Sequence, residues 1–240
     1  MKQNSPLKNI TISKVIISIL IIFFIALFTY DATHKTLNKD TNGGDKAWNS
    51  NMTLGDLDSS NVLIEYTDYF CSYCAEINEA TNNENFKKDY VDTKKIRREN
   101  RVTTILGDVS VNTEQGAEAA YCAADQNKYW EYSDDIVSNI KIDYFNKGIG
   151  VKNVASPKKI DKLPISYFTK SAKTVGMNTE KFEACVSSEA HKSEIESNTQ
   201  KAIDLGVNGL PYLVINEYKA SGFSGGYKGL LNVLKAGGVE

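Results

Sequence analysis

Apolar runs alternate with segments of helical periodicity from residue 62 to residue 235. Short β-branched and aromatic runs predict strands, and apolar residues at helical spacing predict helices. Strands are expected at residues 62–66, 98–106 and 212–215. Helices are expected from residue 71 onward and at residues 114–127, 129–140, 165–175, 179–187, 191–205 and 227–235, with a turn at 222–226. This order predicts an α/β layered sheet with a run of helices inserted between its second and third strands.

A separate apolar run near residue 1 predicts a membrane anchor. Residues 15–28 are apolar except for Ser18, and the stretch 10–30 reaches the roughly 20 residues that a spanning helix needs. Three lysines and no acidic residue precede Asp31, which places the start of the chain in the cytoplasm and the rest outside. A cleaved signal peptide has a similar pattern, but no small-x-small cleavage site follows the run. An uncleaved, single-pass anchor over residues 1–30 in the cytoplasmic membrane is therefore favoured.

The rest of the chain divides into a linker and one domain. Residues 31–53 are mostly polar and contain a Gly-Gly pair, which is typical of a tether. Residues 54–240 are expected to form the domain, with the helical insertion at about 108–190. The net charge of the chain is −2, and it is −5 once the three lysines of residues 1–30 are set aside. A mildly acidic domain outside the cytoplasm would lie where disulfides persist.

Composition excludes several classes of function. Hydrophobic residues make up 41% of the chain, which is enough to bury a core, and the near balance of charges gives no case for a nucleic-acid partner. Only two histidines are present, His34 and His191. That scarcity argues against a histidine-based zinc site and against Ser-His or Cys-His catalysis. No metal and no cofactor are expected.

Cys71 and Cys74 form a Cys-x-x-Cys motif between a predicted strand and a predicted helix. Two cysteines at this spacing share one face of a helix, and the first lies among the free backbone N–H groups of the leading turn. The positive end of the helix dipole there favours a thiolate. Cys71 is therefore expected to be the exposed, attacking sulfur and Cys74 the buried, resolving one. A zinc half-site and a purely structural bridge are alternatives, but the context favours redox chemistry.

Four segments together resemble the DsbA-like thiol-disulfide oxidoreductases. They are residues 61–74 (NVLIEYTDYFCSYC), 117–132, 182–185 and 205–216. The resemblance spans about residues 54–238 and implies a thioredoxin-like fold with an inserted helical domain, preceded here by the N-terminal transmembrane helix.

The resemblance also implies roles for residues around the motif. Pro211 matches a proline that follows a cis peptide bond opposite the cysteines, where Leu210 would present its backbone to a substrate chain; a plain turn is the alternative. Ser72 and Tyr73, between the cysteines, would also contact substrate. Ser72 stands where near relatives have proline, and Leu210 stands where Thr or Val is more common.

Glu65 matches an acid that helps to move a proton to or from the buried cysteine in the family. A buried carboxyl would have a raised pKa that suits this role. A solvated acid on an edge strand is the alternative.

The remaining cysteines, Cys122 and Cys185, fall on predicted helices of the insertion. Some relatives carry a second disulfide there, which would stabilise the domain by about 4 kcal/mol in the chain-entropy model. Two separate buried thiols are the alternative. The aromatic residues near 129–132 and 167–168 are expected in the core rather than in a groove. The basic run at 94–101 is expected to be a solvated face.

These observations favour a membrane-anchored, extracytoplasmic oxidoreductase that introduces disulfides into exported proteins through a mixed disulfide at Cys71. Its partners would be reduced or unfolded exported proteins and a quinone-linked reoxidase of the DsbB or vitamin-K-epoxide-reductase type. A disulfide isomerase or reductase of the same fold, and a non-catalytic peptide-binding chaperone, are the alternatives.

Overall fold

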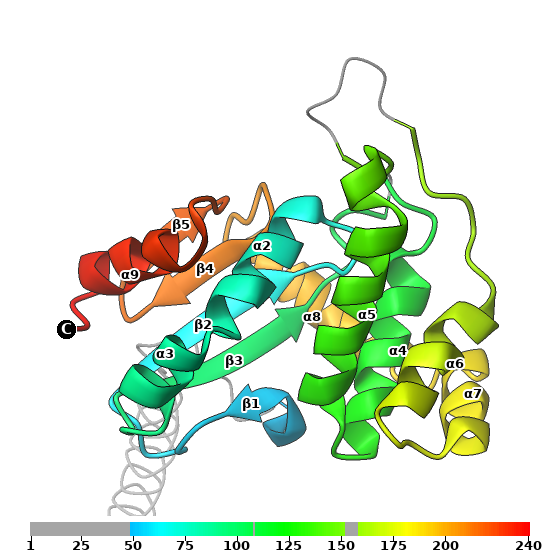
Figure 1. Cartoon of the computed structure of the whole chain (residues 1–240), viewed down its shortest axis with the longest axis horizontal. Helices are drawn as coiled ribbons and strands as arrows, with labels where there is room; N and C mark the ends of the chain where they lie inside the picture. Colours follow the sequence, from blue (N-terminus) through cyan, green and yellow to red (C-terminus); the bar gives the residue numbers. More distant parts are fainter. Residues whose placement is uncertain (1–48, 108, 152–157) are drawn as a thin grey trace, which may run out of the picture. The chain divides into compact units, whose positions relative to one another are not determined.

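The computed structural model describes residues 49–107, 109–151 and 158–240. A five-stranded sheet runs through it in the order β1-β3-β2-β4-β5 (Figure 1). Only β2 and β3 are parallel, and the other neighbouring pairs are antiparallel. The strands are β1 (Thr53–Leu54), β2 (Asn61–Thr67), β3 (Ile96–Val102), β4 (Tyr212–Ile215) and β5 (Tyr218–Ser221).

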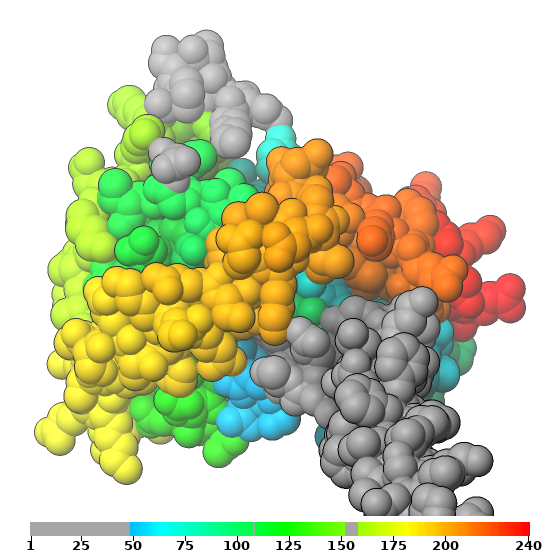
Figure 2. All heavy atoms as spheres, turned by 180° about the vertical axis from the view of Figure 1, so that it is seen from behind, coloured from blue at the N-terminus to red at the C-terminus, as the bar shows by residue number. Residues whose placement is uncertain are grey.

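Helices cover both faces of the sheet, which explains why β2 is buried almost throughout. On one face, α2 (Ser72–Thr81) and α9 (Gly226–Ala236) lie side by side, and the segment α3 (Glu84–Phe86) with the short π-helix η2 (Lys87–Val91) follows α2 (Figure 1). The view from behind in Figure 2 shows α8 (Lys192–Asp204) on the opposite face. Successive side chains of β2 point to opposite faces of the sheet and therefore pack in two different hydrophobic cores, one on each face.

The remaining helices form a bundle beside the sheet. They are α4 (Thr113–Asp125), α5 (Tyr129–Asp143), α6 (Ile165–Thr174) and α7 (Thr179–Ser187), with the short turns η1 (Ser50–Met52) and η3 (Phe145–Lys147). Five alanines of α4 are buried, and such small side chains let neighbouring helices approach closely. Tyr129, Tyr132 and Phe168 are at most 1% exposed in this core, as expected, whereas Trp130 and Tyr167 of the same ranges are only partly buried against it.

Most predicted elements are present, with two differences at the sheet. The strand expected at 98–106 is β3, which runs from Ile96 and ends at Val102 because residues 105–107 form a turn. Strand β5 follows a two-residue turn and is largely exposed, so it lacks the apolar pattern that marks a buried strand. The sequence indicated only the later turn at 222–226.

The predicted membrane span at residues 10–30 and most of the linker lie outside the described residues. Within the described ranges, none of the helices combines the length and the apolar character needed to cross a membrane.

Candidate active site

The Cys-x-x-Cys motif lies where β2 passes into α2. Cys71 is the N-cap residue of α2, with extended backbone angles, and its carbonyl oxygen accepts hydrogen bonds from the backbone N–H groups of Cys74 and Ala75. Its own N–H donates to the carbonyl of Asp68 at 3.1 Å. The two cysteines thus occupy the first turn of α2, among backbone N–H groups that have no partner within the helix.

The expectation that Cys71 is an exposed sulfur is wrong. Cys71 is 7% exposed and Cys74 is 5% exposed, and both are free thiols. The reason is an apolar cluster that joins the sheet, α8 and the loop before β4 around the motif, and that includes Val207, Leu210 and Tyr212. Access to Cys71 is therefore narrow, and the two sulfurs differ little in burial.

The Leu210–Pro211 peptide bond is cis and faces the motif. The Cys71 thiol donates to the carbonyl oxygen of Leu210, with 3.5 Å between Sγ and O. Leu210 and Pro211 are themselves buried, whereas Ser72 and Tyr73 are partly exposed. The structure thus brings together Cys71, Leu210 and Pro211, which lie about 140 residues apart in the chain.

Glu65 is fully buried, which rules out the alternative of a solvated acid. Both of its carboxylate oxygens are occupied by the equally buried Arg98: Oε1 lies 2.5 Å from Nε, and Oε2 lies 3.0 Å from Nη2. The guanidinium also stacks over the ring of Trp130, with its carbon 4.5 Å from the ring centroid. Burial raises the pKa of Glu65, and the charge of Arg98 opposes that rise.

The basic run at 94–101 is only partly the solvated face that was expected. Arg98 and Arg101 lie on β3 at 0% and 4% exposure. Arg101 donates to the hydroxyl of Tyr66 and to the carboxylate of Glu99, each at 3.0 Å. A buried strand can carry arginine when every guanidinium is paired, because an unpaired buried charge is costly.

Asp68 is an acidic residue to which the sequence analysis assigned no role. It is 1% exposed, and its Oδ1 accepts from the backbone N–H of Phe70 at 2.8 Å, whereas Oδ2 is buried without a hydrogen-bond partner. Burial raises the pKa of Asp68 to about 7. The sequence feature that could have identified Asp68 is its position in Thr67-Asp68, at the end of a strand that leads directly into the motif.

The Cys74 thiol is electrostatically distinct from an exposed thiol. Burial raises its pKa well above the usual value, and the interaction with the Cys71 sulfur raises it further. The backbone of Asp68 acts in the opposite direction. Cys74 therefore keeps its proton unless a neighbouring group takes it.

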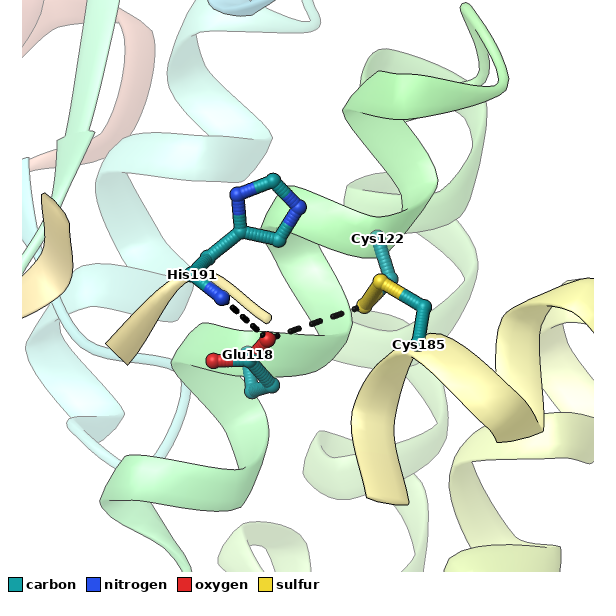
Figure 3. A group of neighbouring side chains, drawn as sticks. All are labelled: Glu118, Cys122, Cys185 and His191. Carbon is teal, nitrogen blue, oxygen red and sulfur yellow. Dashed lines mark hydrogen bonds between the residues drawn. A yellow bond between two sulfur atoms is a disulfide. The ribbon is translucent and has the colours of Figure 1, made fainter. Parts of the chain in front are cut away.

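Cys122 on α4 and Cys185 on α7 form a disulfide, with an S–S distance of 2.01 Å and 63 residues of separation. Glu118 and His191 lie beside it, and the potential ligand atoms of these four residues are within 4.8 Å of one another (Figure 3). The backbone N–H of His191 donates to Glu118 at 2.7 Å. Because a metal would need thiolates, the joined sulfurs serve here as a covalent link between two helices.

Comparisons with known proteins agree with this arrangement. A family model described as thioredoxin matches residues 48–235. No curated protein gives a significant match. The solved structure of a thioredoxin-like oxidoreductase from Silicibacter pomeroyi is 22% identical, with a TM-score of 0.57, 83% of this chain and 96% of that chain covered.

Two further solved structures share the fold. The thiol-disulfide exchange protein alpha-DsbA2 from Wolbachia pipientis is 22% identical, with a TM-score of 0.58, 84% of this chain and 90% of that chain covered. BdbD from Bacillus subtilis is 13% identical, with a TM-score of 0.60 and coverages of 78% and 91%. The chain therefore belongs to the thioredoxin family, and its fold is that of the DsbA-like thiol-disulfide oxidoreductases, as the sequence resemblance predicted.

Proposed function

We propose that this thioredoxin-family protein is a membrane-anchored oxidoreductase that introduces disulfides into exported proteins through Cys71 and Cys74. The observation that carries the proposal is the 3.5 Å contact between the Cys71 sulfur and the Leu210 carbonyl, at the first turn of a helix and opposite a cis proline. This contact brings the reactive sulfur next to a backbone edge that can hold an extended peptide.

In the forward reaction, a substrate thiolate attacks the Cys71 sulfur of the Cys71–Cys74 disulfide. A bond forms between the substrate sulfur and Cys71, the bond between Cys71 and Cys74 breaks, and Cys74 leaves with the electron pair and takes up a proton. A second substrate thiolate then attacks the substrate's own sulfur in the mixed disulfide, the bond between that sulfur and Cys71 breaks, and Cys71 leaves with the electron pair and takes up a proton. The substrate gains a disulfide and is oxidised, and the enzyme is left with two thiols, the state in which both cysteines are free.

Substrate contacts are assigned to the surface around Cys71. Ser72 and Tyr73 are partly exposed and line a groove of about 350 Å³ that also includes Glu76, Lys141 and Phe145. The groove mixes charged and aromatic groups, which suits unfolded substrates of varied sequence.

Reoxidation requires an electron acceptor, and we assign this role to a quinone-linked membrane protein of the DsbB or vitamin-K-epoxide-reductase type. The apolar run at 15–28 behind three lysines supports a location on the outer face of the cytoplasmic membrane. Separating membranes from soluble proteins tests that location: the full chain is expected with the membranes, and a chain that lacks residues 1–30 is expected in the soluble fraction.

The activity is tested by oxidative folding of a reduced ribonuclease. Cys71→Ala is expected to abolish turnover, because no other sulfur of the motif meets the substrate edge at Leu210. The double variant Cys122→Ser with Cys185→Ser is the matched control, since it removes a cysteine pair away from the motif, and it should retain turnover at a temperature where it is folded. Activity that persists in Cys71→Ala would refute the assignment. A reduction potential as low as that of thioredoxin would favour a reductase instead.

A further inference from the structure

Cys74 must exchange a proton in every turnover, and the structure limits which groups can do this. The thiol is 5% exposed, so bulk water has little access to it. A small cavity beside it is lined by Cys74, Glu65 and Asp68 together with Thr67 and Asn100. The cavity has a volume of about 10 Å³, close to the least that can hold one water.

Of the two acids that line this cavity, Glu65 is held in place by its partner. Each of its oxygens bonds to a different nitrogen of Arg98, and both side chains are fully buried. If Glu65 accepted a proton, the guanidinium of Arg98 would be left as an unpaired buried charge, which is strongly unfavourable. The acid at the position favoured by the family resemblance is therefore poorly suited to exchange protons.

Asp68 has the opposite environment. One oxygen is fixed by the backbone N–H of Phe70, and the other is buried beside the Thr113 hydroxyl at the start of α4 without a hydrogen bond of ordinary length. A buried carboxyl that is so weakly held can change its protonation state at little cost to its neighbours. No cation among the described residues is bonded to Asp68 in the way that Arg98 is bonded to Glu65.

We propose that Asp68, and not Glu65, is the residue that exchanges the proton of Cys74, directly or through one water in the cavity. This inference rests on the proposed function and identifies the proton carrier of the same site. When the enzyme oxidises a substrate, protonated Asp68 supplies the proton to the departing Cys74 sulfur. When the enzyme is reoxidised, the Asp68 carboxylate removes that proton as Cys74 attacks.

A small disulfide such as oxidised glutathione reoxidises the enzyme in two steps. Cys71 loses its proton to solvent and attacks one sulfur of the glutathione disulfide, whose S–S bond breaks, so that a mixed disulfide forms and the other glutathione leaves as thiolate. The proton of Cys74 passes to Asp68, the Cys74 sulfur attacks Cys71, and the second glutathione leaves with the electron pair and is protonated by solvent. Once Cys71 is in a mixed disulfide, its thiol no longer raises the pKa of Cys74, which makes the transfer easier.

The other groups that face Asp68 do not offer an alternative. Tyr69 lines the same cavity, and burial raises its pKa far above neutrality. From α5 the cavity receives Val137, and from α4 the neighbouring side chain is the Thr113 hydroxyl, neither of which is charged. Burial raises the pKa of Asp68 to about 7, which suits a group that must both accept and donate a proton near neutral pH.

The test separates the two steps of reoxidation in the full chain. Reduced enzyme is mixed with oxidised glutathione, quenched with acid, and analysed by mass spectrometry for the mixed disulfide and for the Cys71–Cys74 disulfide. Asp68→Asn is expected to slow the second step about 100-fold near pH 7, so that the mixed disulfide accumulates, and to remove an inflection near pH 7 from its pH profile. The exposed Asp92→Asn is the control and should match the wild type.

Two results would overturn the inference. One is a second step in Asp68→Asn within about twofold of the wild type, a difference too small for a lost general base. The other is a wild type that forms no mixed disulfide at all, which would refute the proposed function as well, whereas the first result refutes only the role of Asp68. Should Asp68→Asn not fold, the pH profile of the second step in the wild type decides: a rate that rises through about pH 7 is expected, and a profile with no inflection there would refute the role.

Discussion

Replacing Asp68 with asparagine should change how the stability of the domain depends on pH. The carboxyl is 1% exposed, and burial raises its pKa from 3.8 to about 7. Between about pH 4 and 7 the folded protein therefore keeps a proton that the unfolded chain has released. The folded state binds more protons in this interval, so the free energy of unfolding falls as the pH rises, and the stabilising contribution is complete only below about pH 4.

The size of the effect follows from the same pKa. At about 1.4 kcal/mol for each pH unit, the interval from 3.8 to about 7 corresponds to about 4 kcal/mol, as an upper value. Asparagine has no proton to hold, so this loss should be absent from Asp68→Asn. Its amide can keep the acceptor contact to the Phe70 N–H and can donate to the neighbouring Thr113 hydroxyl. The variant should therefore gain stability relative to the parent as the pH rises.

Urea-induced unfolding at several pH values between about 4 and 8 measures this difference. Both proteins should carry Cys71→Ser and Cys74→Ser, so that thiol titration and oxidation do not contribute. We expect the two stability curves to diverge by a few kcal/mol toward high pH. The exposed Asp92→Asn should run parallel to the parent. If Asp68→Asn also ran parallel, the raised pKa of Asp68 would be refuted, and with it one support for its role as proton carrier.

Three other changes test the packing of the domain by urea unfolding. Arg98→Met should lower the free energy of unfolding by about 3–5 kcal/mol because it leaves the buried Glu65 without its partner. Adding Glu65→Leu should recover much of that loss. If the losses from the two substitutions simply added, the pairing would be contradicted. Cys122→Ser with Cys185→Ser should lower stability by about 4 kcal/mol, and an unchanged midpoint would show that the link constrains little. Gly116→Ala should destabilise by about 1–2 kcal/mol because its Cβ would lie 2.9 Å from Phe70, beside Cys71; a more stable variant would show that Phe70 can move.

The sequence predicted the elements that carry a strong pattern. The buried strand at 62–66, the helix after Cys71 and the short strand at 212–215 are apolar enough to be recognised locally, and each is present. The helices at 165–175 and 179–187 were also placed correctly to within one residue. Apolar periodicity is sufficient to predict a helix or strand where that element buries its apolar residues in a single core.

The environment of the charged residues could not be predicted in the same way. Residues 97–101 contain three arginines, a glutamate and an asparagine, and local pattern assigns such a run to solvent. In the structure the run lies in the second strand from the edge, and Arg98 reaches across to Glu65 on the neighbouring strand. That contact depends on strand order and register, where Leu63 pairs with Arg98, and neither is encoded in the residues of β3 alone.

The two acids near Cys74 show why a family position and a functional role can separate. A buried carboxyl whose two oxygens both bond to an arginine cannot take up a proton without leaving that arginine unpaired, whereas a buried carboxyl with no cationic partner can change charge near neutral pH. In this chain, Arg98 on β3 determines which of the two acids can exchange a proton, because it bonds to both oxygens of Glu65 and leaves Asp68 without a counter-ion. The residue two positions before the acid's own partner on the adjacent strand, Arg98, therefore decides which of the two can act as proton carrier for the resolving cysteine.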